Sequence, residues 1–252
     1  MMLWHKAWRE TRTRFLVSAV ALVAFSAAIV LAQVPIREHA AALPGFRSGP
    51  SYSLHIYNFV YSGLLKTAFI WMIFFLGLGG LPREQAQGTA GFTLALPVSR
   101  LRLVSVRMAV GLAELTALAL APALIIPALS LAIHQYYPLS EALHFSVLWI
   151  ICGTTIYAMT FLFSAMLGGE YTALVVSIVV FFVLDLIVSL APLQPYRLKL
   201  LHIISEFGTM RWDAQHLVLS SGPLPWARLA IFSVASVAML WTAVRVTQRQ
   251  NF

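Results

Sequence analysis

The sequence predicts an all-α polytopic membrane protein with six transmembrane helices, and three observations lead to this prediction. First, 60% of the 252 residues are hydrophobic and only 10% are charged, whereas soluble domains are about 45–50% apolar and about 25% charged. Second, six windows reach the roughly 20 mostly apolar residues that a membrane-spanning helix needs. Third, each window is apolar around its whole circumference, which excludes an amphipathic helix on the surface of a soluble domain.

The six expected spans belong to one transmembrane domain that covers residues 1–252. The first window follows a basic start, as in a secretory signal peptide, but its apolar stretch exceeds the roughly 7–15 residues of such signals. Because five more spans follow it, we expect this window to be retained as a span. The windows are Phe15–Val34, Phe59–Leu81, Met108–Ala132, Leu143–Leu167, Thr172–Leu190 and Ala227–Val246.

The basic residues predict that both termini are cytoplasmic, because short cytoplasmic loops are enriched in Lys and Arg. The loop between the second and third spans carries four arginines, whereas the loop between the third and fourth spans carries none. The net charge of +8 is explained by this topology signal and by contact with anionic membrane lipid. Nucleic-acid binding is therefore not predicted.

Residues 1–14 are expected to form an interfacial helix before the first span. Trp4 and Trp8 recur at helical spacing, and Arg9 and Arg12 alternate with them. This pattern is typical of a helix that lies in the inner interface, with its apolar face in the acyl chains and its basic face towards the head groups. The alternative is an ordinary basic flank with two tryptophans in the aromatic belt.

The longest cytoplasmic loop, residues 82–107, is polar at its start and apolar in its second part, up to Pro97. We expect a short helix that lies on the membrane surface and presents Glu84 to a partner. Gly88 and Gly91 weaken this segment as an autonomous helix, so packing against another protein is expected to support it.

The outer segment 191–226 is expected to be interfacial or re-entrant. Between residues 197 and 207 the apolar side chains share one side of a helix and the polar side chains share the other. This apolar run is too short to cross a membrane. A re-entrant segment must pack against protein to satisfy its backbone hydrogen bonds.

Three ionisable residues inside the spans are candidate functional residues, because each costs at least ~2.5–3.5 kcal/mol near the membrane centre. Lys66 and Asp185 lie towards the outer ends of their spans, and we hypothesise that they pair near an outer gate, within one protomer or across two. Alternatively, Lys66 reaches the head groups and Asp185 bonds to a neighbouring backbone group or hydroxyl. Glu114 is expected to contact Arg107 or an inner gate, or to be a shallow solvated carboxylate.

Other classes of protein are less well supported. Six of the seven histidines fall on the predicted outer side, but none has chelating spacing, so no metal site is predicted. The motifs Gly-x-Ser-x-Gly and His-Glu-x-x-His are absent, which disfavours an intramembrane hydrolase. A secondary transporter would show matching helix breaks in its two halves, and none is evident. It stays an alternative, as does a non-transporting membrane partner.

The cytoplasmic loop also resembles a known family. Its pattern Glu84…Gly88-Thr89…Leu96-Pro97-Val98-Ser99-Arg100 is similar to the loop after the second span in bacterial ABC-2-type permeases, the membrane subunits of type V exporter-like ABC transporters. In that family the loop is a coupling helix seated in a cleft of the nucleotide-binding subunit. The resemblance implies a coupling role for Arg83, Glu84, Gln85, Gln87, Gly88, Thr89, Phe92, Pro97 and Arg100.

The resemblance also implies partners and a location. These are two copies of an ABC ATPase subunit that bind ATP and Mg, a second permease in a homo- or heterodimer, and the cell inner membrane. This chain has no Gly-x-x-x-x-Gly-Lys-[Ser/Thr] motif, so no cofactor is expected on it. Spans two and five would line the pathway, and the apolar surface favours a hydrophobic or amphipathic substrate (drug, antibiotic, peptide or lipid). The candidate pathway or gate residues are Lys66, Phe69, Asp185 and Glu114.

Overall fold

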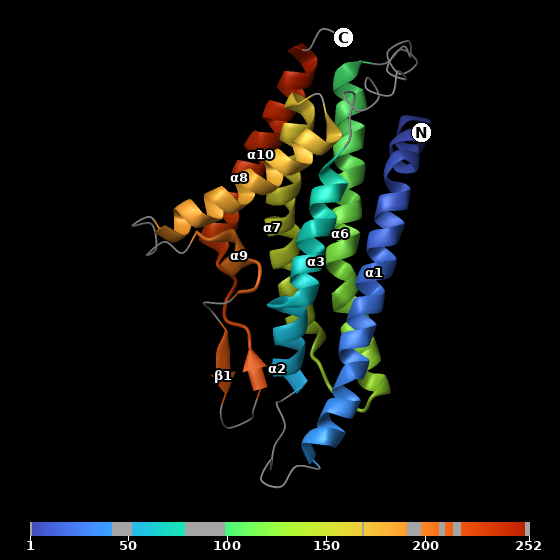
Figure 1. The fold of residues 1–252 in the computed structure, drawn as a ribbon, viewed down its shortest axis with the longest axis vertical. Helices are drawn as coiled ribbons and strands as arrows, with labels where there is room; N and C mark the ends of the chain where they lie inside the picture. Colours follow the sequence, from blue (N-terminus) through green and yellow to red (C-terminus); the bar gives the residue numbers. More distant parts are fainter. Residues whose placement is uncertain are drawn as a thin grey trace.

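Helices make up almost all of the described structure, a computed structural model (Figure 1). It describes residues 2–41, 52–78, 99–167, 169–190, 198–206, 210–213 and 218–249. Among these residues, six helical segments are long and apolar enough to cross a membrane. The predicted all-α polytopic fold with six spans is therefore confirmed. The helices are α1 (Met2–Ala41), α2 (Tyr52–Ile56), η1 (Tyr57–Tyr61), α3 (Leu64–Gly77), α6 (Arg100–Ala132), α7 (Leu139–Met166), α8 (Glu170–Leu190), α9 (Leu200–Ile203) and α10 (Trp226–Arg249).

The predicted separate interfacial helix is not observed, because residues 2–14 are the first turns of the continuous helix α1. No glycine or proline precedes Pro35, so nothing in this stretch interrupts the backbone hydrogen bonds of a helix. Ala7 and Thr11 are both buried, which shows that this part of α1 packs against protein. At about 1.5 Å per residue, the helix is about 60 Å long, roughly twice the thickness of the hydrocarbon layer.

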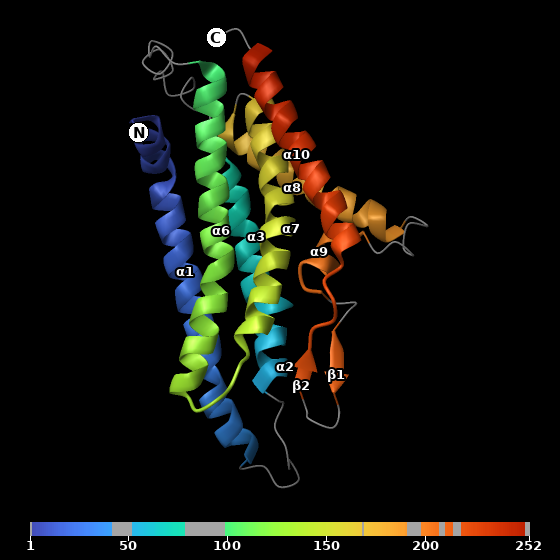
Figure 2. The same ribbon diagram turned by 180° about the vertical axis from the view of Figure 1, so that it is seen from behind.

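The long helices run side by side, with both chain termini at one end of the bundle (Figures 1 and 2). We call this the termini end. It also holds the end of α3 at Gly77 and the start of α6 at Arg100. The opposite end, which we call the hairpin end, holds α2 and the two short strands. Helix α8 differs from the other spans because it crosses the bundle obliquely.

One part of the core, between the second span (η1 and α3) and α7, is aromatic. Tyr61 stacks on Phe145 with ring centroids 3.9 Å apart, and Phe69 stacks on Trp149 at 4.4 Å. All four side chains are at most 1% exposed. The two helices approach closely at Gly153, where an added Cβ would lie 2.8 Å from Ile73. Offset aromatic stacking at such centroid distances adds to the energy of burial.

The second span begins before the predicted window 59–81, and it is not one regular helix. It begins at Tyr52, passes through the π-helix η1, and restarts as α3 after Ser62 and Gly63. The restart requires a glycine, because a Cβ on Gly63 would lie 2.2 Å from the carbonyl oxygen of Asn58. Residues 79–81 lie outside the described residues.

The described part of residues 191–226 contains α9 and an antiparallel hairpin of β1 (Arg211–Asp213) and β2 (Val218–Ser220), in which Trp212 pairs with Leu219. The start of α7 holds this segment through two side chains. His144 forms an ion pair with the buried Glu206, and Glu141 accepts a hydrogen bond from the Ser221 hydroxyl at 2.5 Å.

Candidate functional site

The predicted coupling residues themselves lie mostly outside the described residues. This applies to Arg83, Glu84, Gln85, Gln87, Gly88, Thr89, Phe92 and Pro97, whereas Arg100 begins α6 and its side chain is not described. The structure does show the two helix ends between which this segment runs. Helix α3 ends at Gly77, and α6 starts after Ser99, whose Oγ accepts a hydrogen bond from the Arg102 backbone amide at 3.3 Å. An N-cap serine of this kind satisfies an amide at the start of a helix.

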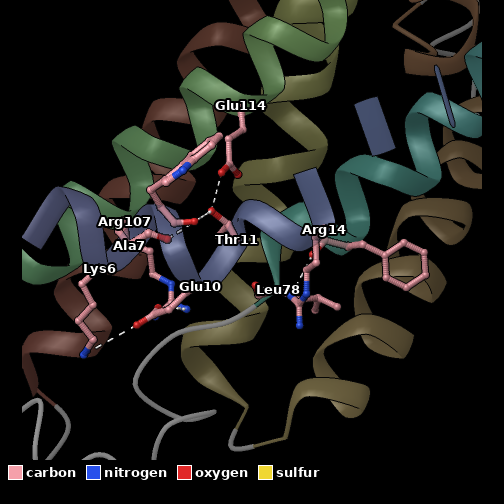
Figure 3. Close-up of polar contacts among 10 residues, drawn as sticks. Lys6, Ala7, Glu10, Thr11, Arg14, Leu78, Arg107 and Glu114 are labelled. Carbon is pink, nitrogen blue, oxygen red and sulfur yellow. Dashed lines mark hydrogen bonds and ion pairs between the residues drawn. The ribbon is translucent and has the colours of Figure 1, made fainter. Parts of the chain in front are cut away.

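Arg14 of α1 binds the end of α3, as Figure 3 shows. Its Nη1 donates to the carbonyl oxygens of Phe75 at 3.2 Å and Leu78 at 3.0 Å. The last carbonyls of a helix have no intrahelical partner, and a cation is favourable beside them because of the helix dipole. Leu78, the last described residue before residues 79–98, is therefore held directly by α1.

A second contact joins α1 to the first turns of α6. Arg107 Nη2 lies 3.0 Å from Glu10 Oε2, and Lys6 lies 3.8 Å from the same carboxylate (Figure 3). The sequence had suggested that Arg107 contacts Glu114, and this is wrong in the described structure. The arginine turns towards the carboxylate of α1 because α1 packs along α6 at this end.

Glu114 instead contacts Thr11, with Thr11 Oγ1 2.5 Å from Glu114 Oε1. The side chains lie between α1 and α6 (Figure 3), and Glu114 is only 2% exposed. The alternative of a shallow solvated carboxylate is therefore also wrong. The other carboxylate oxygen, Oε2, has no hydrogen-bond partner among the described residues. Because a buried polar group is costly without partners, the Thr11 contact fixes how α1 and α6 face each other.

Helix α7 joins the same region through Tyr157. An added Cβ on Gly111 would lie 2.2 Å from the Tyr157 hydroxyl oxygen, so the phenol rests directly on α6, one turn before Glu114. Tyr157 is 1% exposed. We call the set Glu10, Thr11, Arg14, Arg107 and Glu114 the polar cluster of the termini end. It connects α1 with α3 and α6, and it borders α7.

The predicted pair of Lys66 and Asp185 is not formed within this chain. Asp185 Oδ2 lies 3.3 Å from Lys199 Nζ, and Lys66 forms no ion pair with a described side chain. The reason lies in the path of the chain. Because α8 runs obliquely, its end lies beside α9 (Figures 1 and 2), and Lys199 directly precedes α9.

Phe69 does not line an open surface, contrary to the prediction, because it is fully buried in the stack on Trp149. The exposed aromatic residues of α3 are Trp71 and Phe75, at 41% and 46%. The sequence shows that this span is rich in aromatic residues. Only the structure shows which of them pack against α7 and which are exposed.

The N-terminal residues of the predicted interfacial helix belong to α1. Trp4, Arg9 and Arg12 are exposed, and Trp8 packs on Phe15 with ring centroids 5.4 Å apart. Sequence reasoning missed the roles of Thr11 and Arg14. The sequence pattern could have predicted that Thr11 is buried, because it lies on the same face of the helix as the buried residues Ala7, Ser18 and Leu22.

The described contacts of this region join helices to one another. Among the described residues, no group of three or more His, Cys, Asp or Glu side chains could hold a metal ion. The polar cluster joins α1 to the end of α3 and to the first turns of α6, the two helix ends that flank residues 79–98 in the sequence. The chain matches no family model and no curated protein.

Proposed function

We propose that this chain is the permease subunit of an ATP-driven ABC exporter, with the ATPase on a separate polypeptide. One observation carries the proposal: the loop that resembles a coupling helix leaves and re-enters the bundle at helices that the polar cluster joins. Arg14 holds the end of α3, and Glu10 and Thr11 hold the first turns of α6. A displacement of the loop is therefore transmitted to three helices together.

The proposed cycle uses this connection. Two permeases form the pathway, and two ATPase subunits bind ATP and Mg and close on each other. Their closure pulls on the loop around Glu84, which displaces α3 and α6, and α1 follows through Arg14 and Thr11. Access then switches from the cytoplasmic side to the outer side of the inner membrane, with both termini in the cytoplasm.

The substrate in this proposal is hydrophobic or amphipathic, such as a drug, antibiotic, peptide or lipid. The spans expected to line the pathway support this choice. Helix α3 exposes Trp71 and Phe75, and α8 exposes Val179, Phe182 and Leu186, all at 41–57%. Apolar surfaces of this kind favour ligands with a large apolar part.

A secondary transporter is less well supported, because such folds carry broken helices at corresponding positions of two repeated halves. The second span breaks at Ser62 and Gly63. Its counterpart in the other half of a three-plus-three arrangement would be the fifth span, α8, which is continuous from Glu170 to Leu190.

The test is co-purification of the tagged chain from its native membrane, followed by mass spectrometry. A protein with a Gly-x-x-x-x-Gly-Lys-[Ser/Thr] motif should accompany the wild-type chain. It should be lost from the double variant Glu84→Lys, Gly88→Trp, because both changes alter the proposed contact. A matched control, Tyr136→Lys, alters a residue that is 77% exposed at the hairpin end and should retain the ATPase.

Two results of this co-purification experiment would contradict parts of the proposal. If a well-folded wild-type preparation yields no such ATPase, the exporter assignment is wrong, and a secondary transporter or a stand-alone membrane protein becomes the better explanation. If the ATPase accompanies the wild-type chain and the loop variant equally, the exporter assignment stands but the coupling role of residues 82–107 is wrong.

A further inference from the structure

The end of α9 and the residues after it are buried, although this part of the chain forms no long helix. Ile203, Ile204, Ser205 and Glu206 are each at most 3% exposed. The two isoleucines belong to the hydrophobic core. The Glu206 amide donates to the carbonyl oxygen of Ile203 at 2.9 Å, which closes a turn. We call residues 203–206 the buried turn.

Two side chains from other elements hold the buried turn. The Tyr57 hydroxyl of η1 donates to the carbonyl oxygen of Ser205 at 3.3 Å. Nε2 of His144, at the start of α7, forms an ion pair with Oε2 of Glu206. The rings of Tyr57 and His144 both pack on Phe145, with ring centroids 6.1 Å and 5.8 Å away. The buried turn is therefore fixed between η1 and the start of α7.

Glu206 adopts an unfavourable conformation in this turn. Its φ is 51°, in the left-handed region. A residue with a Cβ rarely adopts this backbone conformation, and it persists only where the surrounding structure holds it. The carboxylate is also fully buried, and a buried charge is costly unless it is paired. Both the backbone and the side chain of Glu206 therefore favour release of the turn when the contact with His144 weakens.

The contact with His144 depends on a proton. An imidazole is a cation only when it is protonated, and histidine is the side chain whose ordinary charge change falls between about pH 5 and pH 8. A charge-assisted contact is stronger than one with a neutral donor. The side chain of His144 is 14% exposed, whereas that of Glu206 is 0% exposed. The proton is therefore exchanged with solvent through His144, and the contact strengthens as the pH falls.

Two other histidines lie on the elements that pack against α7. His202 lies in α9, and the exposed His134 follows the end of α6. Burial lowers the pKa of His202, and the cation of Lys199 lowers it further, while Asp185 opposes this effect. His202 therefore becomes charged at a lower pH than an ordinary histidine. Away from the termini end, the other ionisable groups of these elements are of types that ordinarily titrate outside this range: Tyr57, Lys66, Glu141, Asp185, Lys199 and Arg228.

We propose that His144 and Glu206 form a proton-dependent latch, which fixes residues 203–206 between η1 and the start of α7 when the imidazole is protonated and releases them when it is neutral. Glu141 is not part of the latch, because its carboxylate accepts hydrogen bonds from the backbone amide and hydroxyl of Ser221. This inference does not rest on the proposed exporter function, because every group of the latch belongs to this chain and none requires an ATPase.

The test is amide hydrogen exchange of the full-length chain in nanodiscs, measured by mass spectrometry on peptides that cover residues 203–206. Exchange is followed at about pH 5.5 and about pH 8, on either side of the ordinary charge change of histidine. Each variant is compared with the wild type at the same pH, so the effect of pH on the exchange chemistry cancels. The variants are His144→Gln and the isosteric Glu206→Gln. The controls are His202→Gln, His134→Asn and His5→Gln, which alters an exposed histidine at the termini end.

The latch predicts a difference that appears only at the lower pH. At about pH 5.5 the buried turn should exchange about tenfold faster in His144→Gln than in the wild type, the lower end of the range for a hydrogen bond to a charged group. Glu206→Gln should show the same acceleration, and the double variant should add nothing further, because the two residues act as one pair. At about pH 8 the wild type and His144→Gln should agree within about twofold, since neutral imidazole and amide side chains are both neutral donors.

Three results would overturn the proposal. An acceleration in His144→Gln that is the same at both pH values would mean that the contact is structural and does not respond to a proton. Loss of the pH dependence in His202→Gln or His134→Asn would assign the response to another histidine. If His144→Gln does not fold, Glu206→Gln decides: an exchange rate equal to that of the wild type at about pH 5.5 would show that the pair does not hold the turn.

Discussion

Helices α7 and α8 are consecutive apolar spans, yet one forms the centre of the bundle and the other its edge. In the most apolar window of each helix, 67% of α7 is buried but only 17% of α8. Helix α7 packs against α3, α6 and α10, whereas α8 contacts mainly α7 and crosses the bundle obliquely (Figure 2). Hydropathy is higher for α8, so hydropathy alone does not tell which span is central.

The difference arises from small and hydroxyl-bearing residues. In α7, Gly153 admits a close approach of α3, and Thr155 Oγ1 lies 2.9 Å from Ser236 Oγ of α10. Ser146 donates to the carbonyl oxygen of Ala119 in α6 at 2.8 Å. In α8, by contrast, Ser177 donates to Ala173 of its own helix. Small residues and interhelical hydrogen bonds drive helix packing in membranes, so these residues of α7 account for its closer packing against several neighbours.

The largest expected effect comes from removing the core aromatic of α7. Trp149→Ala should lower the free energy of unfolding by about 3–5 kcal/mol, because it leaves a cavity against Phe69 and Tyr61. Unfolding of the detergent-solubilised chain by denaturant measures this change. A loss below about 1 kcal/mol would mean that α7 is not the packing centre.

A smaller loss is expected from the polar contact between α1 and α6. Thr11→Val keeps the shape of the side chain but deprives the buried Glu114 carboxyl of its only described hydrogen-bond partner. The cost should be about 1–3 kcal/mol. Thr13→Val, an exposed position on the same helix, serves as the control. If both variants lose stability equally, helix propensity rather than the contact explains the result.

Arg14→Gln should change stability by only about 0.3–1 kcal/mol, the usual range for a cation at a helix end. Its functional effect should be larger if the exporter proposal holds. The variant complex should keep its ATPase subunits and their ATP hydrolysis but lose transport, because α1 no longer follows the end of α3. The exposed Arg12→Gln should retain both activities. Equal transport in Arg14→Gln and Arg12→Gln would show that Arg14 does not transmit the movement of the loop.

The smallest effect is predicted for the outer face of α8. Phe182 is 51% exposed, so Phe182→Ala should alter stability by less than about 0.5 kcal/mol in detergent. Phe182→Ala and Trp149→Ala each remove one aromatic side chain, from α8 and α7 respectively, so their losses of stability can be compared directly. A large loss in Phe182→Ala would show that this face is packed in the assembled protein, and the contrast between the helices would then fail.

The sequence predicted the fold class and the number of spans well, because both depend on apolar length along the chain. It failed where an outcome depended on neighbours in space. Contact with Arg107 on its own helix was one of the alternatives expected for Glu114, but its partner is Thr11 of α1. Asp185 was expected either to pair with Lys66 or to bond to a neighbouring backbone group or hydroxyl, but it lies 3.3 Å from Lys199, where the oblique path of α8 brings it. Side chains at similar expected depth can have different partners, and hydropathy does not encode the direction of a helix.

The most direct test of the exporter account is site-specific photo-cross-linking in the native membrane. A photoreactive amino acid is placed at Glu84 in one strain and at Tyr136 in another, and the cross-linked products are identified by mass spectrometry. The account predicts an adduct with an ATPase that carries a Gly-x-x-x-x-Gly-Lys-[Ser/Thr] motif at position 84, with none at position 136. An ATPase adduct from both positions, or from neither, would contradict it.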